Sequence, residues 1–455
     1  MQPGSKDLWF VPLGGTGEIG MNLNLYGHDD QWLMVDCGVS FDEPLVPEYQ
    51  NETAQTSHHP IVCADPKFIV ERKDTLVGIC ITHAHEDHVG AIADLWPRLQ
   101  APIYATPFTA EIMRRKLAER GLEGKAPVHI IPIDSDHTVG CFDISWITMT
   151  HSVPEPSGLI IRTPLGTVFH TADWKIDMSP GVGKSFNIKK IKSINEESEL
   201  LAVVGDSTNA TKPGQSCSES TCYHGLRETI RHQQGRVIVG CFASNIARII
   251  SLAKIAQETG RYLCVLGRSM DTMVSAARLT GYWPDDVELV NPQHVGYLPA
   301  HEVLLVATGS QGEPRAALGR LAADSHRLLT LDEQDVIIFS SIIIPGNEKA
   351  IEKIVSQFNA RKVKTIQAET HNLPIHASGH PNRDELVQLY QWLQPEMVIP
   401  THGEHRHMEA HADIAKSQGI RKTFVGKNGD LFRLRPQPSI KRGVIHTGRI
   451  VLSRD

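Results

Sequence analysis

The chain has 455 residues, enough for two or three domains with sizeable cores. Its 41% hydrophobic and 21% charged content is typical of an ordinary soluble protein. No apolar run reaches membrane-spanning length, and the polar first residues lack the apolar core of a signal peptide. The net charge of −7 argues against coating of nucleic acid through overall charge, and we expect a cytoplasmic protein whose eight scattered cysteines are reduced.

The first predicted elements lie between Trp9 and Asp36. Apolar and polar residues alternate there around a glycine-rich stretch at 14–20, which predicts a hairpin that opens a β-sheet. The stretch has glycine spacing similar to a dinucleotide-binding loop. However, no helical pattern follows it, and residues 22–26 continue as a strand.

The next predicted strand, Leu76–Thr82, is followed by a run of metal-capable side chains. The apolar run 76–82 predicts a buried strand, and 90–99 has helical spacing, so the sequence HAHEDH at 83–88 lies on a strand-to-helix turn. Nitrogen and carboxylate ligands at this density suit Zn²⁺ or a similar ion. His83 and His85 can face one ion, and Asp87 and His88 a second.

Later strands deliver further candidate ligands at their ends. His151 follows a predicted strand at 144–150, and Asp173 follows one at 167–170. From about 216 strands alternate with helices, which predicts a parallel sheet inserted into the first domain. After about 360 we expect a return to the first domain through short strands at 364–368 and 397–400, and His402 follows the second of these.

This order of ligands resembles the metallo-β-lactamase superfamily. The resemblance implies an α/β fold, with an αββα sandwich that holds two Zn²⁺ ions, or Mn²⁺, at one rim. It implies that one ion is bound by His83, His85 and His151, and the other by Asp87, His88 and His402, with Asp173 bridging. Asp36 matches the acidic residue that orients the cluster from behind the ligands.

Most of the chain is similar to the β-CASP nucleases, specifically the ribonuclease J family. The segments that carry this resemblance are GDSTNA at 205–210, FASNI at 242–246, GRSM at 267–270, TGSQGEP at 308–314, HASGH at 376–380 and PTHGE at 400–404. It implies a metallo-β-lactamase domain at 1–214 and 361–455 with an inserted α/β β-CASP domain at 215–360. The sequence ends at Asp455, without the C-terminal domain of typical members, which leaves a monomer and a homodimer both open.

The predicted chemistry is hydrolysis of RNA phosphodiesters. Two metal ions lower the pKa of a shared water and stabilise charge on the phosphorus oxygens, and Asp87 belongs to this catalytic centre. His376 is the expected general acid, oriented or charged by Asp206. Small hydroxyls, backbone amides and a helix N-terminus suit an RNA phosphate, and the candidates are Ser244, Asn245, Arg268, Ser378, Gly379 and His380.

We therefore expect a ribonuclease with 5′-to-3′ exonuclease and endonuclease activity on single-stranded RNA, and with no membrane partner. A DNA-directed β-CASP nuclease shares the motifs and would differ in whether it contacts 2′-hydroxyls. A scaffold that binds RNA without cutting it would lack metal. A small-molecule hydrolase of the superfamily would have little use for a large insertion.

Overall fold

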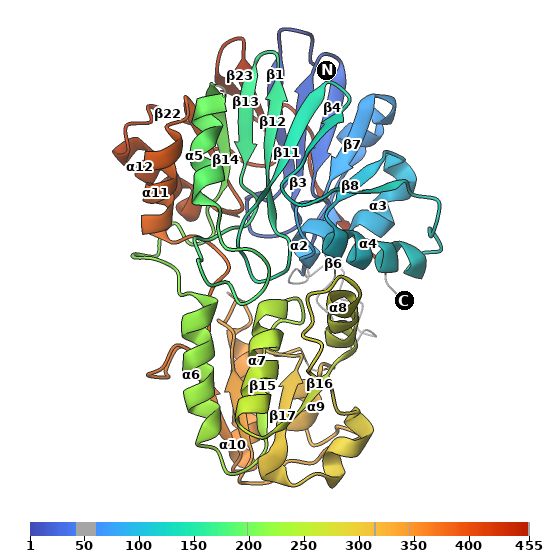
Figure 1. The fold of residues 1–455 in the computed structure, drawn as a ribbon. Helices are drawn as coiled ribbons and strands as arrows, with labels where there is room; N and C mark the ends of the chain where they lie inside the picture. Colours follow the sequence, from blue (N-terminus) through green and yellow to red (C-terminus); the bar gives the residue numbers. More distant parts are fainter. Residues whose placement is uncertain (42–60, 198, 314, 345, 454–455) are drawn as a thin grey trace.

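The computed structural model describes residues 1–41, 61–197, 199–313, 315–344 and 346–453. Pro314, in the 308–314 motif, and Asp455 lie outside these ranges. The chain forms two lobes: a larger one built from the N- and C-terminal parts, and a smaller one built from the middle of the sequence (Figure 1). Within the described ranges, no helix is long and apolar enough to cross a membrane.

Two sheets face each other in the larger lobe. The first has the order β24 (Ser439–Lys441), β23 (Leu431–Arg435), β1 (Leu8–Gly14), β3 (Leu23–His28), β4 (Gln31–Val35), β7 (Leu76–Cys80), β8 (Ile103–Ala105) and β9 (Val128–Ile130). The second has the order β10 (Asp136–Val139), β11 (Phe142–Thr148), β12 (Ser157–Thr163), β13 (Gly166–His170), β14 (Leu200–Asp206), β20 (Met397–Thr401) and β22 (Lys422–Thr423). The predicted hairpin is present, because β1, β3 and β4 pair antiparallel.

Helices cover the outer face of each sheet. Buried side chains such as Phe10, Trp146 and Ile399 fill the space between the sheets, each contributing about 1.5–3 kcal/mol by leaving water. The first sheet is covered by α3 (Ile92–Leu99) and α4 (Pro107–Glu119), and the second by α5 (Ile188–Glu197), α11 (Arg383–Leu393) and α12 (His405–Ser417). This is the expected αββα sandwich.

The smaller lobe is a parallel sheet covered on both faces. Its order is β16 (Tyr262–Leu266), β17 (Val303–Ala307), β15 (Val237–Gly240), β18 (Val336–Phe339) and β19 (Lys364–Gln367). One face carries α6 (Glu219–Arg231), α7 (Ile246–Glu258) and α8 (Arg268–Leu279), and the other carries α9 (Ala317–Ala322) and α10 (Glu348–Ala360). Burial on both faces explains why its central strands are continuous apolar runs.

Two boundaries differ from the sequence expectation. The strand at Lys364–Gln367 was expected to belong to the first domain, but β19 pairs in parallel with β18, so the insertion's sheet extends past 360. The helical segment expected at 90–99 contains α3, and a separate short helix, α2 (Glu86–Val89), precedes it and begins inside the ligand turn. Sequence periodicity identifies the elements but not which sheet a short edge strand joins.

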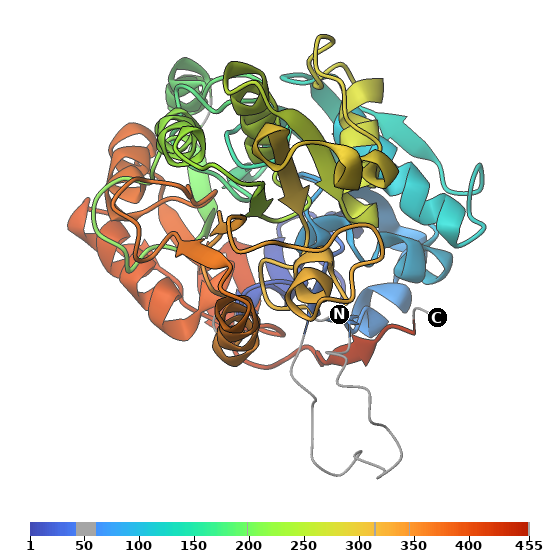
Figure 2. The ribbon, with the colours of Figure 1, turned by 90° about the horizontal axis from the view of Figure 1, so that it is seen from below.

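The carboxyl ends of β13, β14 and β20 meet at one edge of the second sheet. These three strands are parallel neighbours, with Asp206 opposite Thr401 in register. The smaller lobe lies directly below this edge, and it covers the middle of the sandwich when the molecule is viewed from below (Figures 1 and 2). Side chains that follow these strands therefore point toward the boundary between the lobes.

Candidate metal centre

The predicted ligands converge on the carboxylate of Asp173, which follows β13 and is buried. Its Oδ2 lies 3.3 Å from Nε2 of His88, 3.8 Å from Nε2 of His83 and 3.7 Å from Nε2 of His151. Its Oδ1 lies 3.4 Å from Nδ1 of His402 but has no hydrogen-bond partner. A buried carboxylate surrounded by ring nitrogens, with an unbonded oxygen, fits a shared metal ligand.

Three imidazoles form the first group around Asp173. Nδ1 of His85 lies 3.2 Å from Nε2 of His83 and 2.9 Å from Nε2 of His151. Two nitrogens bound at tetrahedral angles to one zinc ion would be about 3.3 Å apart. His83, His85, His151 and Asp173 are thus close to the spacing that one divalent ion requires.

A second group contains Asp87, His88, Asp173 and His402. Oδ2 of Asp87 lies 3.1 Å from Nε2 of His402 and 3.6 Å from Nε2 of His88. Because Asp173 belongs to both groups, two ions bound there would be neighbours. Asp173 and His402 also form a third group, with Asp206 and His380.

The remaining nitrogens of these histidines are held by outer partners. Nδ1 of His88 lies 2.7 Å from Oδ2 of Asp36, and Nδ1 of His151 lies 2.6 Å from the carbonyl oxygen of Gly379. The second ring nitrogens of His83, His85 and His402 lie 3.0 Å from Oγ1 of Thr82, 3.2 Å from Oγ of Ser152 and 2.9 Å from Oγ1 of Thr208. Such partners fix the tautomer and orientation of metal-binding histidines.

The electrostatics of the two groups differ. Burial lowers the pKa of His83 and His151 well below the usual value and that of His85 to about 4, so these rings are neutral and able to bind a metal. Burial acts in the same direction on His88 and His402, but nearby carboxylates, Asp173 foremost, outweigh it and raise both pKa values well above the usual one. The carboxylates that attract a proton there would also attract a cation.

The expected pairing of His376 with Asp206 is wrong. Nδ1 of His380 lies 2.7 Å from Oδ2 of Asp206, whereas Nδ1 of His376 lies 3.3 Å from the carbonyl oxygen of Ser340 in the insertion. Burial, reinforced by the charge of Arg248, lowers the pKa of His376 to about 3, which makes it a poor proton carrier near neutral pH. His380, which we had assigned to phosphate binding, occupies the place next to the centre.

The other phosphate-binding candidates have different surroundings in the structure. Oγ of Ser378 accepts a hydrogen bond of 2.9 Å from Asn209, and a Cβ on Gly379 would lie 2.2 Å from the His151 ring, so only glycine fits there. The buried Asn245 side chain caps α7 by accepting from the Arg248 N–H at 2.9 Å. Arg268 is exposed at the start of α8, and Ser244 is partly buried beside the α7 cap.

Sequence reasoning missed several polar residues around the centre, Ser152 among them. Thr82 donates its N–H to Asp36 at 2.8 Å, and Thr208 donates its hydroxyl to Asp206 at 2.7 Å. Nδ2 of Asn22 lies 3.2 Å from Nε2 of His88, and Asn209 bonds Ser378. Thr82 directly precedes the ligand His83, and Thr208 lies two positions after Asp206. These positions are the sequence signal that could have identified them.

Comparison with known families and proteins agrees with this geometry. The chain matches the metallo-β-lactamase superfamily over residues 20–181, the ribonuclease J β-CASP domain over 234–358 and a Zn-dependent metallo-hydrolase RNA specificity domain over 364–425. A solved structure of a protein of unknown function from Enterococcus faecalis covers 94% of this chain and all of its own, with a TM-score of 0.62 at 13% identity, which shows the fold alone.

Three curated relatives align along nearly the whole chain. Ribonuclease J from Sinorhizobium meliloti is 42% identical over 95% of this chain and 75% of its own length. Ribonuclease J from Thermus thermophilus is 34% identical over 98% of this chain and 78% of its own length. Ribonuclease J2 from Bacillus subtilis is 33% identical over 95% of this chain and 76% of its own length. The chain belongs to the ribonuclease J family, with a metallo-β-lactamase domain and an inserted β-CASP domain.

Proposed function

We propose that this protein is a ribonuclease that hydrolyses phosphodiesters of single-stranded RNA, from the 5′ end and internally, with two bound Zn²⁺ ions; Mn²⁺ is the alternative metal. The observation that carries the proposal is the single carboxylate, Asp173, shared by two groups of metal-capable side chains at the boundary between the lobes. The curated relatives named ribonuclease J support RNA as the substrate.

Each ligand group has a distinct part in the proposed reaction. His83, His85 and His151 would hold one ion, Asp87, His88 and His402 the other, and Asp173 both. Two such ions supply a water of lowered pKa and neutralise charge on the phosphorus oxygens. Asp36 keeps the His88 ring in place through the 2.7 Å contact, and this fixes the nitrogen that faces Asp173.

We assign proton transfer to His380 in place of His376. Nδ1 of His380 is held by Asp206, and its ring stacks on His402 with centroids 5.5 Å apart. Burial opposes charge on His380, but the carboxylates of Asp206 and Asp173 raise its pKa above the usual value. A proton on Nε2 can then be given to the leaving oxygen, while Asp206 stabilises the charged ring.

The remaining candidates form the proposed phosphate path. Ser378 and Gly379 lie next to His380 in sequence, and Ser244 and Arg268 lie at the carboxyl edge of the insertion's sheet, where parallel sheets bind ligands. Asn245 is already engaged as a helix cap, so we expect it to support this path rather than to bind phosphate through its side chain.

Cleavage of RNA with different 5′ ends tests the proposal. We expect wild-type protein to degrade 5′-monophosphate RNA faster than 5′-triphosphate RNA, and the Asp87→Ala, His88→Ala double variant to degrade neither. Equal rates on the two RNAs would show that the proposed phosphate path does not distinguish the phosphates of the 5′ end. Full activity in the double variant would rule out the metal mechanism.

Further measurements test the finer parts of the proposal. RNA and DNA of one sequence, assayed side by side, would decide between the ribonuclease and a DNA-directed nuclease. Metal analysis of purified protein that finds no ion, with no cleavage after Zn²⁺ or Mn²⁺ is added, would favour the non-catalytic scaffold. Light scattering would decide between a monomer and a homodimer, and a cytoplasmic location stays a prediction.

A further inference from the structure

A buried carboxylate, Glu155, joins the loop after His151 to helix α4. Glu155 is only 5% exposed and has a positive φ of 58°, a conformation that costs a non-glycine residue energy. Its Oε2 accepts a hydrogen bond of 2.7 Å from the N–H of Phe108, in the first turn of α4. The N-terminus of a helix stabilises a negative charge, so the loop is anchored to the first domain there.

The second oxygen of the same carboxylate is bound by the insertion. The Tyr282 hydroxyl, three residues beyond the end of α8, donates to Oε1 of Glu155 at 2.9 Å. The Tyr282 ring also meets the edge of Phe108, with centroids 6.3 Å apart. Glu155 therefore accepts one hydrogen bond from each lobe.

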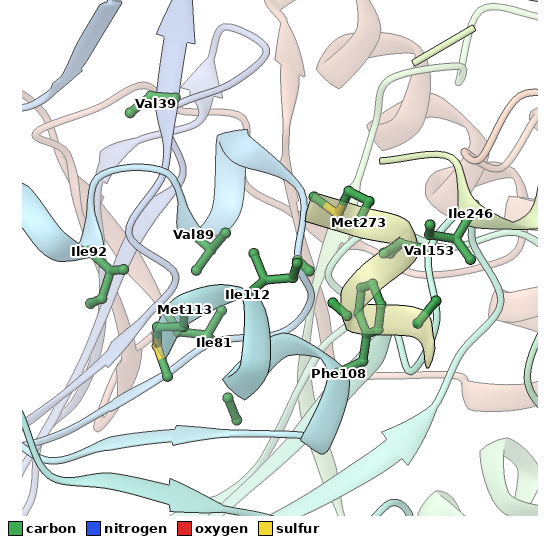
Figure 3. Packing of buried hydrophobic residues seen from close by; sticks show 14 of the residues in the cluster. Val39, Ile81, Val89, Ile92, Phe108, Ile112, Met113, Val153, Ile246 and Met273 are labelled. Atoms are coloured by element: carbon green, nitrogen blue, oxygen red, sulfur yellow. The ribbon is translucent and has the colours of Figure 1, made fainter. Parts of the chain in front are cut away.

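Helix α8 is attached to α4 along a continuous seam. Arg115 of α4 donates to the carbonyl oxygen of Thr272 and to Oγ of Ser275, each at 3.1 Å. Met273 of α8 lies in one apolar cluster with Phe108 and Ile112 of α4 (Figure 3). The interface therefore fixes α8 in two ways, and Tyr282 anchors its C-terminal end.

The two ends of α8 have different roles in the proposed site. The helix has 12 residues and is therefore roughly 18 Å long. Arg268, at its first position, is exposed and is one of the proposed RNA contacts. A small rotation about the Tyr282 end would displace Arg268 relative to the metal centre.

We propose that Glu155 and Tyr282 are positioning residues: their hydrogen bond fixes α8, and with it Arg268, relative to the loop that carries His151. The inference rests on the proposed ribonuclease function and adds to it how the insertion is held over the metal centre. Burial makes charge on this carboxyl costly and raises the pKa of Glu155, and the hydrogen bonds from Phe108 and Tyr282 act in the opposite direction and offset part of that cost.

The chain offers a conservative variant and a matched control. Tyr282→Phe keeps the aromatic ring and removes only the hydroxyl. The ring lines a cavity of about 210 Å³ together with His151 and Glu155. Tyr223→Phe is the control, because Tyr223 also donates to a glutamate, Glu258, but both of these residues belong to the insertion.

The test compares a polymer with a small substrate. For a 5′-monophosphate RNA oligonucleotide, we expect kcat/KM of the Tyr282→Phe variant to fall about tenfold, the effect of one lost hydrogen bond to a charged group. Hydrolysis of bis(p-nitrophenyl) phosphate, which needs the metal centre alone, stays unchanged. Binding of a cleavage-resistant phosphorothioate RNA to the metal-loaded protein, measured by fluorescence anisotropy, weakens in Tyr282→Phe, and Tyr223→Phe matches wild type in all three measurements.

Each other outcome contradicts the inference. If Tyr282→Phe leaves RNA cleavage and binding unchanged, the contact does not position α8. If both substrates lose activity equally, Tyr282 acts on the fold or on the metal centre instead. Wild-type protein that cleaves bis(p-nitrophenyl) phosphate but not RNA would overturn the proposed function and this inference together, whereas failure of the variant alone leaves the proposed function intact.

Discussion

Two histidine-rich segments meet the metal centre in different ways. In the turn at 83–88, all three histidines lie in the ligand groups around Asp173. Of the two histidines in the segment at 376–380, His380 reaches the centre, while His376 contacts the carbonyl oxygen of Ser340 in the insertion. A histidine-rich segment therefore predicts metal ligands only where the backbone geometry of the segment is also known.

The difference has a physical cause. The turn runs from the end of β7 into α2, so His83 and His85 occupy alternate positions after the strand, and Asp87 and His88 lie in the short helix that follows. The 376–380 segment has no helix or strand. Its direction is set by distant partners, because the carbonyl oxygen of Ile375 accepts from Oγ of Ser340 at 2.6 Å and Ser378 is held by Asn209.

The largest expected effect is a difference in activity between variants of His380 and His376, the two histidines of the 376–380 segment. We predict that His380→Ala lowers kcat on RNA by about 10²- to 10⁴-fold, the usual contribution of a general acid. His376→Ala, four residues away, should keep most of the activity because this ring does not contact Asp206. Single-turnover cleavage of end-labelled RNA measures both. The reverse order of effects would restore His376 as the acid.

A third histidine-rich segment, α12, provides a structural contrast. His411 is fully buried there, with Nδ1 2.9 Å from Oγ of Ser207 and with the Tyr390 hydroxyl as its other partner. Burial lowers its pKa to about 4, although the charge of Asp206 acts in the opposite direction. Between about pH 6.5 and pH 4 the unfolded chain thus binds a proton at this position that the folded chain does not, and stability falls with decreasing pH.

This histidine should therefore affect stability rather than chemistry. The shift corresponds to roughly 3 kcal/mol of the unfolding free energy lost between about pH 6.5 and pH 4. We predict that His411→Gln, which can keep both hydrogen bonds, lacks this part of the pH dependence. Urea unfolding of both proteins across that range is the measurement, and identical pH slopes would show that His411 does not contribute.

A smaller effect, on metal affinity, is expected from Asp36, which contacts His88 in the 83–88 turn. Asp36 has a φ of 65°, which asparagine tolerates, so Asp36→Asn should keep the backbone while removing the charge beside His88. Loss of such an outer partner typically lowers metal affinity about 10- to 100-fold. Competition with a fluorescent zinc chelator would measure the change, and unaltered affinity would mean that Asp36 only supports the fold.

How much could be predicted from the sequence depended on how locally each feature is determined. Strand-end residues such as Asp173 and His402 could be placed because parallel strands deliver their carboxyl ends to one edge. The partner of Asp206 could not, because it depends on how an irregular loop lies between the two lobes. The Glu155–Tyr282 contact joins residues 127 positions apart and has no sequence pattern at all.

The most direct test of the central claim is anomalous diffraction at the zinc absorption edge from crystals of the protein grown with Zn²⁺. The account predicts two anomalous peaks, one among His83, His85 and His151 and the other among Asp87, His88 and His402, both next to Asp173. No peak at Asp173, or a single peak between Asp206 and His380, would contradict it.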